Sequence, residues 1–411
     1  MAIKKLDPVL IYLVAAFVTS LSTTMAFTTS VIYRVQAVGL DPLQLVLVGT
    51  TLEATVFLFE IPTGVVADVY SRRLSIIVGG LLVGLGFMIE GFAPLFAVVL
   101  LSQVVWGLGW TFISGANSAW ISDEVGVQRA TPLFLRGGQL GLLGNLAGIP
   151  ISVWLAEQSL GLPFIMGGGL RILLVIFLIA FMPETGFQRK PLEERESWQD
   201  LWYTVRAGLM HVRQQAVLMT FTLIALFVGF YSEGWDRLGG ALLLERFTFP
   251  DLFGVEMDAV RWFGLLGFVG ILLGLGASEI AKRFVDQNKG QGLPRILQGL
   301  YAGMVLGMFL FAFTGNFFLA ILAMLSFNTL RTVTHPLTEA WLNQNVPSRV
   351  RATVLSMAGQ LDALGETAGG PIIGAIGSLR SLRAALITSA MILLPSVPLW
   401  GYITRQSKQA E

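Results

Sequence analysis

Long apolar runs recur along nearly the whole of this 411-residue chain. A membrane-spanning helix needs about 20 mostly apolar residues, because the hydrocarbon core of a bilayer is about 30 Å thick and a helix rises about 1.5 Å per residue. Twelve runs meet this requirement, six in each half of the chain: 8–30, 44–66, 74–91, 95–120, 132–156, 163–183, 214–236, 259–280, 295–313, 316–342, 352–377 and 380–402. The sequence therefore predicts an all-α membrane protein with twelve transmembrane helices.

The composition argues against other classes of protein. Charged residues make up 13% of the chain, compared with roughly 25% in soluble domains. The net charge of +1 leaves no excess for binding nucleic acid, and the absence of cysteine excludes disulfides and thiolate metal sites. The first apolar run continues well past the roughly 7–15 residues of a signal-peptide core, so we interpret it as a retained helix.

Lysine and arginine are concentrated in alternate loops of this topology, beginning with Lys4 and Lys5. In membrane proteins these residues are in excess in the cytoplasmic loops. We therefore expect both termini to be cytoplasmic, in a bacterial-type inner or plasma membrane. Arg380 and Arg383 depart from the pattern, because they fall in a loop expected outside.

The longest polar stretch, residues 184–213, separates the two groups of six helices. Within it Trp198, Trp202 and Leu209 recur at helical spacing, which is typical of an amphipathic helix lying on the membrane surface. A linker helix packed against the protein is an equal alternative. The domains expected are two six-helix bundles, 1–183 and 214–411, joined by this linker.

One segment occurs twice, in the fifth apolar run of each half. The sequence GQLGLLGNLAGIPI begins at Gly138, and GQLDALGETAGGPI begins at Gly359. The pairs Ala-Trp at 119–120 and at 340–341 extend the likeness upstream. We infer a duplication that gives two pseudo-symmetric bundles in the same orientation. Parallel repeats of this kind occur in transporters, with the substrate site between them near the membrane midplane.

Both copies combine glycines four residues apart with a proline. Glycines at this spacing share one helix face and allow a neighbouring backbone to approach closely, and proline interrupts the helical hydrogen bonds and can bend the helix. We expect helix bending at the interface between the halves, with tight packing as the alternative. The residues are Gly144, Gly148, Pro150, Gly365, Gly369 and Pro371.

A charged loop between the second and third runs reads Gly-Val-Val-Ala-Asp-Val-Tyr-Ser-Arg-Arg from Gly64 to Arg73. It resembles the signature loop of the major facilitator superfamily, although Val69 and Ser71 depart from that pattern. Twelve spans in duplicated halves resemble the same superfamily over the whole chain. The resemblance implies that Gly64, Asp68, Arg72 and Arg73 form a cytoplasmic gate between the halves. Positive charge on the cytoplasmic side is the alternative role for the arginines.

The repeated Gly-rich, Pro-containing segments resemble a motif of the drug–proton antiporters in that superfamily. These proteins often carry an arginine in Arg-x-x-x-Gly spacing on the fourth span, where this chain has Gln103. The resemblance implies export of amphipathic or cationic molecules by alternating access, driven by a proton gradient and without a cofactor. The partners expected are a small-molecule substrate and lipid, with the chain acting as a monomer.

Charged residues inside the apolar runs are the candidates for proton coupling. A charge at the centre of a membrane helix costs roughly 2.5–3.5 kcal/mol, so such groups face an interior and commonly have a function. Asp362, Glu366 and Glu53 are the predicted proton-coupling residues, with Arg331 and His335 as charge partners. Low-dielectric surroundings favour the protonated form of a carboxyl group. A fixed ion pair of Arg331 with Asp362 or Glu366 is the alternative.

Aromatic and polar residues in the runs are candidates for the substrate cavity. Trp106 and Trp110 lie four residues apart and can form one apolar wall that accepts a cation, with core packing as the alternative. The predicted cavity residues are Trp106, Trp110, Asn117, Thr24, Gln139 and Gln360.

Other functions receive little support from the sequence. The chain has two histidines, His211 and His335, and no H-E-x-x-H motif, so a metalloprotease is excluded and we expect no enzyme and no metal site. No G-x-x-x-x-G-K-[ST] loop is present, which argues against ATP-driven pumping. A proton-coupled uptake carrier for a nutrient or organic ion is the alternative to export.

Overall fold

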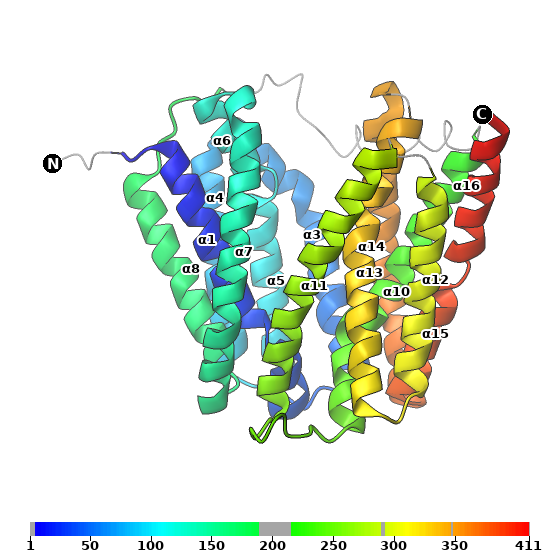
Figure 1. Ribbon diagram of the computed structural model, residues 1–411. Helices are drawn as coiled ribbons and strands as arrows, with labels where there is room; N and C mark the ends of the chain where they lie inside the picture. The colour runs from blue at the N-terminus through cyan, green and yellow to red at the C-terminus, as the bar shows by residue number, and fades with distance from the viewer. Residues whose placement is uncertain (1–4, 189–214, 289–291, 347, 411) are drawn as a thin grey trace. The chain divides into compact units, whose positions relative to one another are not determined.

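The computed structural model describes residues 5–188, 215–288, 292–346 and 348–410 (Figure 1). The predicted linker helix, which includes Trp198, Trp202 and Leu209, therefore lies outside the described residues. The helices are α1 (Pro8–Phe27), α2 (Ser30–Ile32), the π-helix η1 (Tyr33–Ala37), α3 (Pro42–Val69), α4 (Arg72–Phe92), α5 (Phe96–Ile113), α6 (Ala116–Val125), α7 (Val127–Gln158), α8 (Leu162–Phe181), α10 (Ala216–Arg246), α11 (Ala259–Asn288), α12 (Leu293–Phe313), α13 (Phe317–Asn345), α14 (Ser348–Leu379), α15 (Leu382–Leu393) and α16 (Ser396–Ala410).

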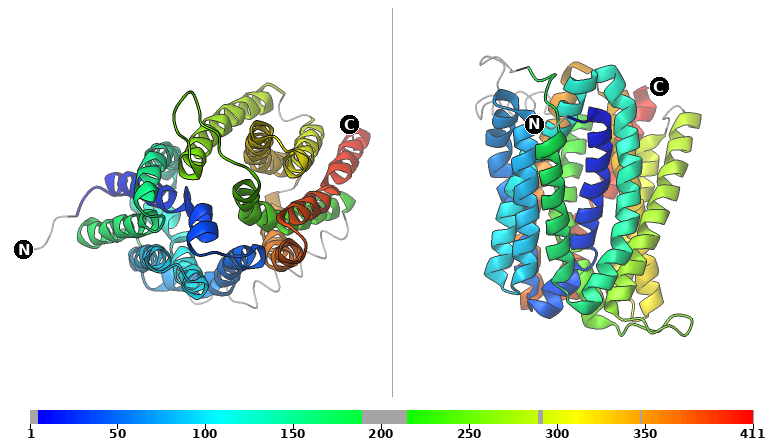
Figure 2. Two further views of the ribbon diagram at one scale, coloured as in Figure 1. Left: turned by 90° about the horizontal axis from the view of Figure 1, so that it is seen from below. Right: turned by 90° about the vertical axis from the view of Figure 1, so that its left-hand side faces the viewer.

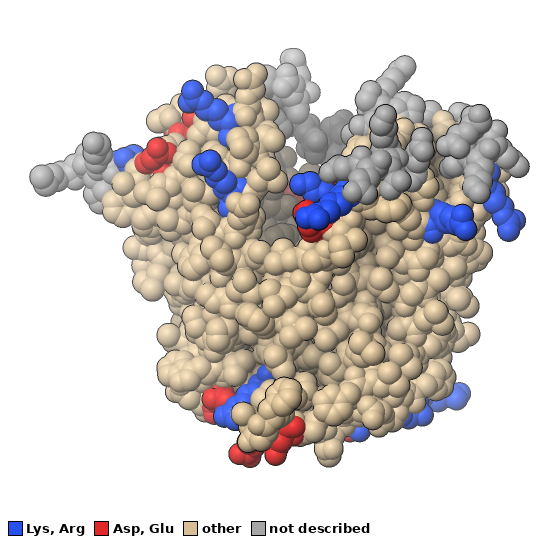
Figure 3. Space-filling model, viewed as in Figure 1, with Lys and Arg blue, Asp and Glu red and all other residues tan. Residues whose placement is uncertain are grey.

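In the described part of the chain, 11 helices are long and apolar enough to cross a membrane. The eleventh predicted run, 352–377, is not among them; it lies within α14, a helix of 32 residues that carries Asp362 and Glu366. Figure 3 shows charged side chains gathered at the two ends of the helices on the face viewed, with uncharged surface between them. The predicted all-helical membrane fold is confirmed.

The sequence signals that start two of the helices act as expected. Asp7 precedes Pro8, and its carboxylate accepts a 2.7 Å hydrogen bond from the backbone N–H of Val9. At the start of α3, Asp41 accepts a 3.0 Å hydrogen bond from the backbone N–H of Gln44. A carboxylate before the first turn satisfies backbone donors that lack a helical partner, and proline has no N–H to satisfy there.

The described helices form two compact units. The first comprises 1–40, 51–198 and 257–264, and the second comprises 41–50, 199–256 and 265–411. Helices α3 and α11 therefore each contribute residues to both units.

In the first unit, α1 packs against α7 and α8, and α4 packs against α5 and α8. Figure 2 allows these helices to be followed from the side and along their axes. One apolar core joins Ile11, Trp120, Ile121 and Met182. A second core brings together Tyr33, Phe87 and other aromatic side chains. These contacts hold α1, α4 and α8 together.

In the second unit, α10 packs against α14 and α15, and α12 packs against α13 and α16. Trp235 of α10 lies against Phe327 of α13 with ring centroids 4.0 Å apart. Its indole N–H donates a 3.0 Å hydrogen bond to Asn328. A buried side chain of this size with its polar atom satisfied fixes the rotation of α10 against α13.

The repeated glycines make equivalent contacts in the two units. A methyl group at Gly144 of α7 would lie 3.0 Å from the backbone nitrogen of Leu21 in α1. A methyl group at Gly365 of α14 would lie 2.7 Å from the backbone nitrogen of Phe230 in α10. The fifth predicted span of each half therefore packs tightly on the first span of the same half, as in the packing alternative.

The prolines of the repeat do not end their helices. Pro150 lies inside α7, which continues to Gln158, and Pro371 lies inside α14, which continues to Leu379. Bending at these prolines stays a prediction.

Candidate functional site

The central feature of the second unit is an ion pair between α13 and α10. Arg331 donates from both terminal nitrogens to the carboxylate of Asp236, and the Nη2–Oδ2 distance is 2.9 Å. The guanidinium carbon also lies 5.8 Å from the ring centroid of Tyr231. Paired fork contacts of this kind are the strongest arginine–carboxylate geometry.

This pairing differs from the one considered from the sequence. There the alternative to proton coupling was a fixed pair of Arg331 with Asp362 or Glu366. The carboxylate that receives the hydrogen bonds of Arg331 is instead that of Asp236. The physical reason is the rotation of α10, which turns Asp236 toward α13 and which apolar periodicity does not determine.

Two further carboxylates of the second unit also have partners. Arg237 donates from Nε to Glu233 Oε2 over 3.1 Å, one helical turn away. The buried hydroxyl of Ser232 donates to Oε1 of Glu366 over 3.0 Å. Glu366 is thus held by a neutral hydroxyl of the adjacent helix.

Asp362 differs from these carboxylates. Its Oδ1 is buried and accepts no hydrogen bond within the described residues. Its backbone lies directly against Gly229 of α10, where no side chain intervenes. Asp362 is therefore held close to the charged residues of α10 while this oxygen stays without a donor.

His335 and Glu53 are the remaining residues predicted for proton coupling. His335 is 3.9 Å from Glu339 on an exposed face of α13. Glu53 is partly buried in α3, in the section that belongs to the first unit. His335 also lies within electrostatic range of Asp362.

In the signature loop, Arg72 connects two helices of the first unit. Its Nε lies 2.6 Å from Asp123 of α6, and its Nη1 lies 3.5 Å from Asp68 of α3. Gly64 has open space around it, with nothing within 4 Å of an added methyl group. Asp123 is a partner that sequence analysis missed.

The start of α4 is fixed by a second acidic residue absent from the sequence prediction. Glu184 accepts a 2.6 Å hydrogen bond from the hydroxyl of Ser71 and a 2.9 Å bond from the backbone N–H of Arg73. The guanidinium of Arg73 donates to the carbonyl of Ile179 over 2.6 Å. The loop is thereby tied to the end of α8, and a carboxylate at the positive end of α4 is electrostatically favourable.

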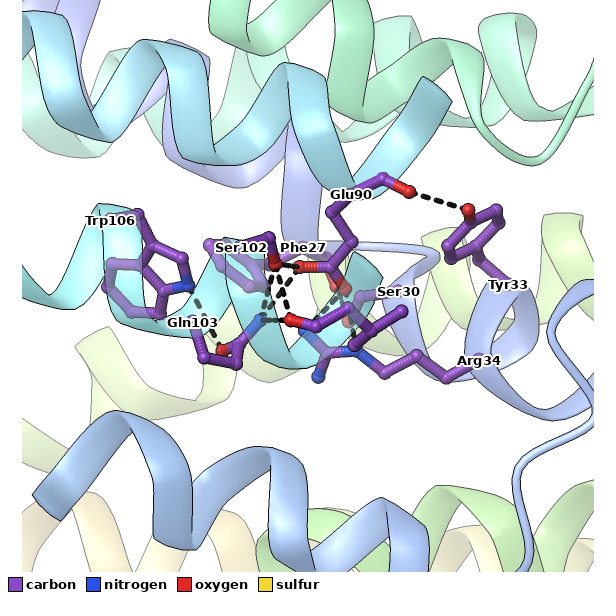
Figure 4. A network of polar contacts seen from close by, with 9 residues as sticks. Phe27, Ser30, Tyr33, Arg34, Glu90, Ser102, Gln103 and Trp106 are labelled. Atoms are coloured by element: carbon purple, nitrogen blue, oxygen red, sulfur yellow. Dashed lines mark hydrogen bonds and ion pairs between the residues drawn. The ribbon is translucent and has the colours of Figure 1, made fainter. Parts of the chain in front are cut away.

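A buried ion pair in the first unit was also missed (Figure 4). Glu90 of α4 is completely buried and lies 2.8 Å from the guanidinium of Arg34 in η1. Ser102 and Gln103 of α5 each donate a 2.8 Å hydrogen bond to the other carboxylate oxygen. Gln103, the residue at the position of the antiporters' arginine, is therefore part of this network. A glutamate inside the apolar run 74–91 was the available signal.

The predicted substrate-cavity residues lie in different surroundings. Trp106 packs against Phe27 and Phe87 and donates a 3.0 Å hydrogen bond to Gln103, so it belongs to the core. Thr24 donates a 2.9 Å hydrogen bond to Asn145. Gln139 is exposed, and Gln360 is half-buried.

Trp110 and Asn117 lie together at a small cavity inside the first unit. This cavity of about 90 Å³ is also lined by Thr19 of α1 and Arg171 of α8. The two tryptophans do not form one wall, because Trp106 is held in the aromatic core and Trp110 borders the cavity.

Comparisons with known proteins agree on the fold. The family model described as Major Facilitator Superfamily matches residues 12–370. The chain is 24% identical over 373 residues to an uncharacterized MFS-type transporter, YxaM, of Bacillus subtilis (strain 168), covering 89% of this chain and 88% of that protein.

Solved structures share the fold at low sequence identity. A mutant of the nucleoside transporter NupG matches with a TM-score of 0.80 at 13% identity, covering 97% of this chain and 100% of that one. A POT family transporter in complex with 5-aminolevulinic acid matches with a TM-score of 0.75 at 13% identity, covering 98% and 96%. A bacterial homologue of the human lysosomal transporter Spinster matches with a TM-score of 0.73 at 14% identity, covering 97% and 96%.

Proposed function

This chain belongs to the Major Facilitator Superfamily and is a secondary transporter; we propose that it exports amphipathic small molecules in exchange for protons. Asp362 is the residue that binds the coupling proton. The observation that carries the proposal is the buried Oδ1 of Asp362, which has no hydrogen-bond donor among the described residues.

The contrast with neighbouring carboxylates supports this assignment. An ionised carboxylate in a membrane needs a cation, a hydrogen-bond donor or water to remain charged. Asp236 has Arg331, and Glu233 has Arg237. Asp362 has no equivalent partner at Oδ1, so loss of water from this oxygen favours binding of a proton.

The coupling follows from two protonation states of one group. When water reaches Asp362 from the side of higher proton concentration, its carboxylate takes up a proton and becomes neutral. When the site opens to the opposite side, hydration and the nearby Arg331 favour release of that proton. Exchange results if the deprotonated carrier can change orientation only with substrate bound, whereas the neutral carrier changes orientation with or without it, since proton and substrate then use the same conformational cycle in opposite directions.

The proposed substrate class is narrower than the one implied by the sequence. The resemblance implied amphipathic or cationic substrates, and Trp106 with Trp110 was the candidate wall for accepting a cation. Trp106 is held in the core, which leaves Trp110 alone as a candidate surface for a substrate. We therefore propose amphipathic molecules and leave out the cationic class.

Export is proposed from the resemblance of the two Gly-rich, Pro-containing segments to the antiporter motif. Proton-coupled uptake is the second candidate, since the solved structures with this fold include proteins named as nucleoside and peptide transporters. The chain acts as a monomer with both termini in the cytoplasm under either proposal.

The test begins with growth of an efflux-deficient bacterium that expresses the wild type or Asp362→Asn. We expect the wild type to protect against some members of a panel of amphipathic antibacterials, and the variant to give no protection at equal expression. Purified protein in proteoliposomes should then drive the protective compound against its gradient when a pH gradient is imposed. Asp362→Asn should still catalyse exchange of labelled compound without a pH gradient.

Three outcomes would contradict the proposal. Sensitisation to the panel, with accumulation inside cells, would favour uptake. Transport that ignores the pH gradient would exclude proton coupling. Uphill transport by Asp362→Asn at the wild-type rate would move the proton site elsewhere, with Glu53 as the next residue to test.

A further inference from the structure

Arg171 differs from the other membrane-embedded arginines of the structure. Its exposed fraction is 4%, and its Nε is buried without a hydrogen-bond partner. Within the described residues it forms no ion pair or hydrogen bond. Arg34, Arg237 and Arg331, by contrast, each contact a carboxylate.

A buried, unpaired guanidinium is unfavourable, because arginine keeps its charge and has lost its water. Such a group is retained where something else supplies the missing negative charge. The interior of the first unit provides space for it, because Arg171 borders the cavity of about 90 Å³.

The lining of this cavity is suited to one chemical group. Asn117 offers an amide that can donate a hydrogen bond, and Thr19 offers a hydroxyl. Trp110 and Ile76 supply apolar surface on the same cavity. The guanidinium forms a planar fork that matches the two oxygens of a carboxylate.

The size of the cavity limits what can enter. One water molecule needs roughly 10–15 Å³ of such space, so about 90 Å³ accommodates a group of a few heavy atoms. Pockets that bind drug-sized ligands measure roughly 300–1,000 Å³. A carboxylate therefore fits, while the apolar part of the same molecule must remain outside the cavity.

We propose that Arg171 binds the carboxylate of the transported substrate, with Asn117 and Trp110 completing the subsite. The substrate is then an amphipathic organic acid. This inference rests on the proposed function, because it takes the occupant of the cavity to be the transported molecule. It adds the chemical class of the substrate, which the proton site does not determine.

The test uses two probes of the same shape, 4-phenylbutyrate and its neutral amide, with phenyl phosphate as a second anion. Their effect on the thermal unfolding midpoint of the full chain is measured in nanodiscs of phosphatidylcholine. Binding to the folded state alone stabilises it. We expect 4-phenylbutyrate to raise the midpoint by about 2–4 °C and the amide to leave it unchanged.

Variants assign the effect to Arg171. Arg171→Gln should lose the response to 4-phenylbutyrate, with affinity lowered about 10- to 100-fold, and Arg171→Lys should retain part of it. Arg136→Gln is the matched control, because it removes an exposed arginine from the same unit. The midpoint of unliganded Arg171→Gln should equal or exceed that of the wild type, since no native partner is lost.

The same measurement identifies competing occupants. If chloride raises the unfolding midpoint relative to gluconate and 4-phenylbutyrate does not, the site binds an inorganic anion. If phosphatidylglycerol in the nanodisc raises the midpoint and 4-phenylbutyrate does not, the site binds a lipid. Equal shifts with acid and amide, no shift with either anion, or an unchanged response of Arg171→Gln would overturn the proposal.

A final control separates this inference from the proton site. Asp362→Asn should bind 4-phenylbutyrate as the wild type does, because Asp362 belongs to the other unit. Failure of proton coupling with intact Arg171-dependent binding would contradict only the proposed coupling. Intact coupling without that binding would contradict only the subsite.

Discussion

The hydroxyl of Ser232 in α10 donates a 3.0 Å hydrogen bond to Oε1 of Glu366 in α14. One turn earlier on α14, Oδ1 of Asp362 has no donor among the described residues. Two carboxylates that share one helix face thus have different surroundings. The sequence motif treats them alike, whereas the structure gives a reason to expect different roles.

The same chemical change at these two positions should separate those roles. Glu366→Gln keeps an oxygen that can accept the hydrogen bond from Ser232, so we expect uphill transport within about threefold of the wild-type rate, a difference of less than about 0.7 kcal/mol. Asp362→Asn removes the proton-binding group and should eliminate uphill transport. Rates are measured in proteoliposomes under one imposed pH gradient. Equal loss in both variants would show that the two carboxylates act as one site.

The membrane helices could be predicted because their signal is local. An apolar run of sufficient length is legible wherever it occurs, and Asp7 with Pro8 marks the start of α1 at the residue expected. The packing of Gly144 and Gly365 on the first helix of each half was anticipated only as close approach to some neighbour. Glycine spacing indicates a contact face but does not name the partner.

The charge pairs could not be predicted for a related reason. Asp236 and Arg331 lie 95 residues apart, and Arg34 and Glu90 lie 56 apart. Their pairing depends on the rotation of each helix about its axis. In a membrane helix that is apolar on most of its circumference, hydropathy gives little information about that rotation. The sequence therefore identified Arg331 as an embedded charge, but it did not identify Asp236 as its partner or the pair of Arg34 and Glu90.

The buried charges of Arg34 and Glu90 should stabilise the fold only as a pair, because each needs the other as its counter-charge. Glu90→Gln leaves the guanidinium of Arg34 buried without its counter-charge, and such changes cost about 3–5 kcal/mol. We expect a large fall in the thermal unfolding midpoint. Adding Arg34→Met should recover much of the loss, because both charges are then absent and Ser102 keeps an acceptor.

An exposed pair provides the control for this prediction. Arg283 and Glu279 lie 2.9 Å apart with side chains 72% and 53% exposed. Exposed pairs contribute little because water screens them, so Glu279→Gln should leave the midpoint unchanged. A Glu90→Gln variant as stable as this control would show that the buried pair does not support the fold.

Substitution of the two aspartates that contact Arg72 should affect transport and stability differently. Asp123 lies at 2.6 Å from the guanidinium and Asp68 at 3.5 Å. Asp123→Asn should destabilise the protein by about 1–3 kcal/mol, because Arg72 loses its closer partner. Asp68→Asn should leave the unfolding midpoint near that of the wild type yet abolish transport, if Asp68 closes the cytoplasmic gate. Normal transport by Asp68→Asn would remove it from the gate.

Two glycines of α14 allow an open position and a closely packed position to be compared on the same helix. In a helix, alanine is favoured over glycine by about 0.5–1 kcal/mol, so Gly→Ala stabilises wherever space permits. At Gly359 nothing lies within 4 Å of an added methyl group, and Gly359→Ala should raise the unfolding midpoint slightly. At Gly365 the methyl group would lie 2.7–2.9 Å from backbone atoms of α10, which cannot yield as a flexible side chain can.

Gly365→Ala should therefore push α14 away from α10 at a cost of about 1–3 kcal/mol. The same displacement would shift Asp362, whose backbone lies against Gly229. We thus expect Gly365→Ala to lower both the unfolding midpoint and the rate of proton-coupled transport, while Gly359→Ala lowers neither. If Gly365→Ala were as stable and active as Gly359→Ala, close contact between α10 and α14 would not be what positions the proton site.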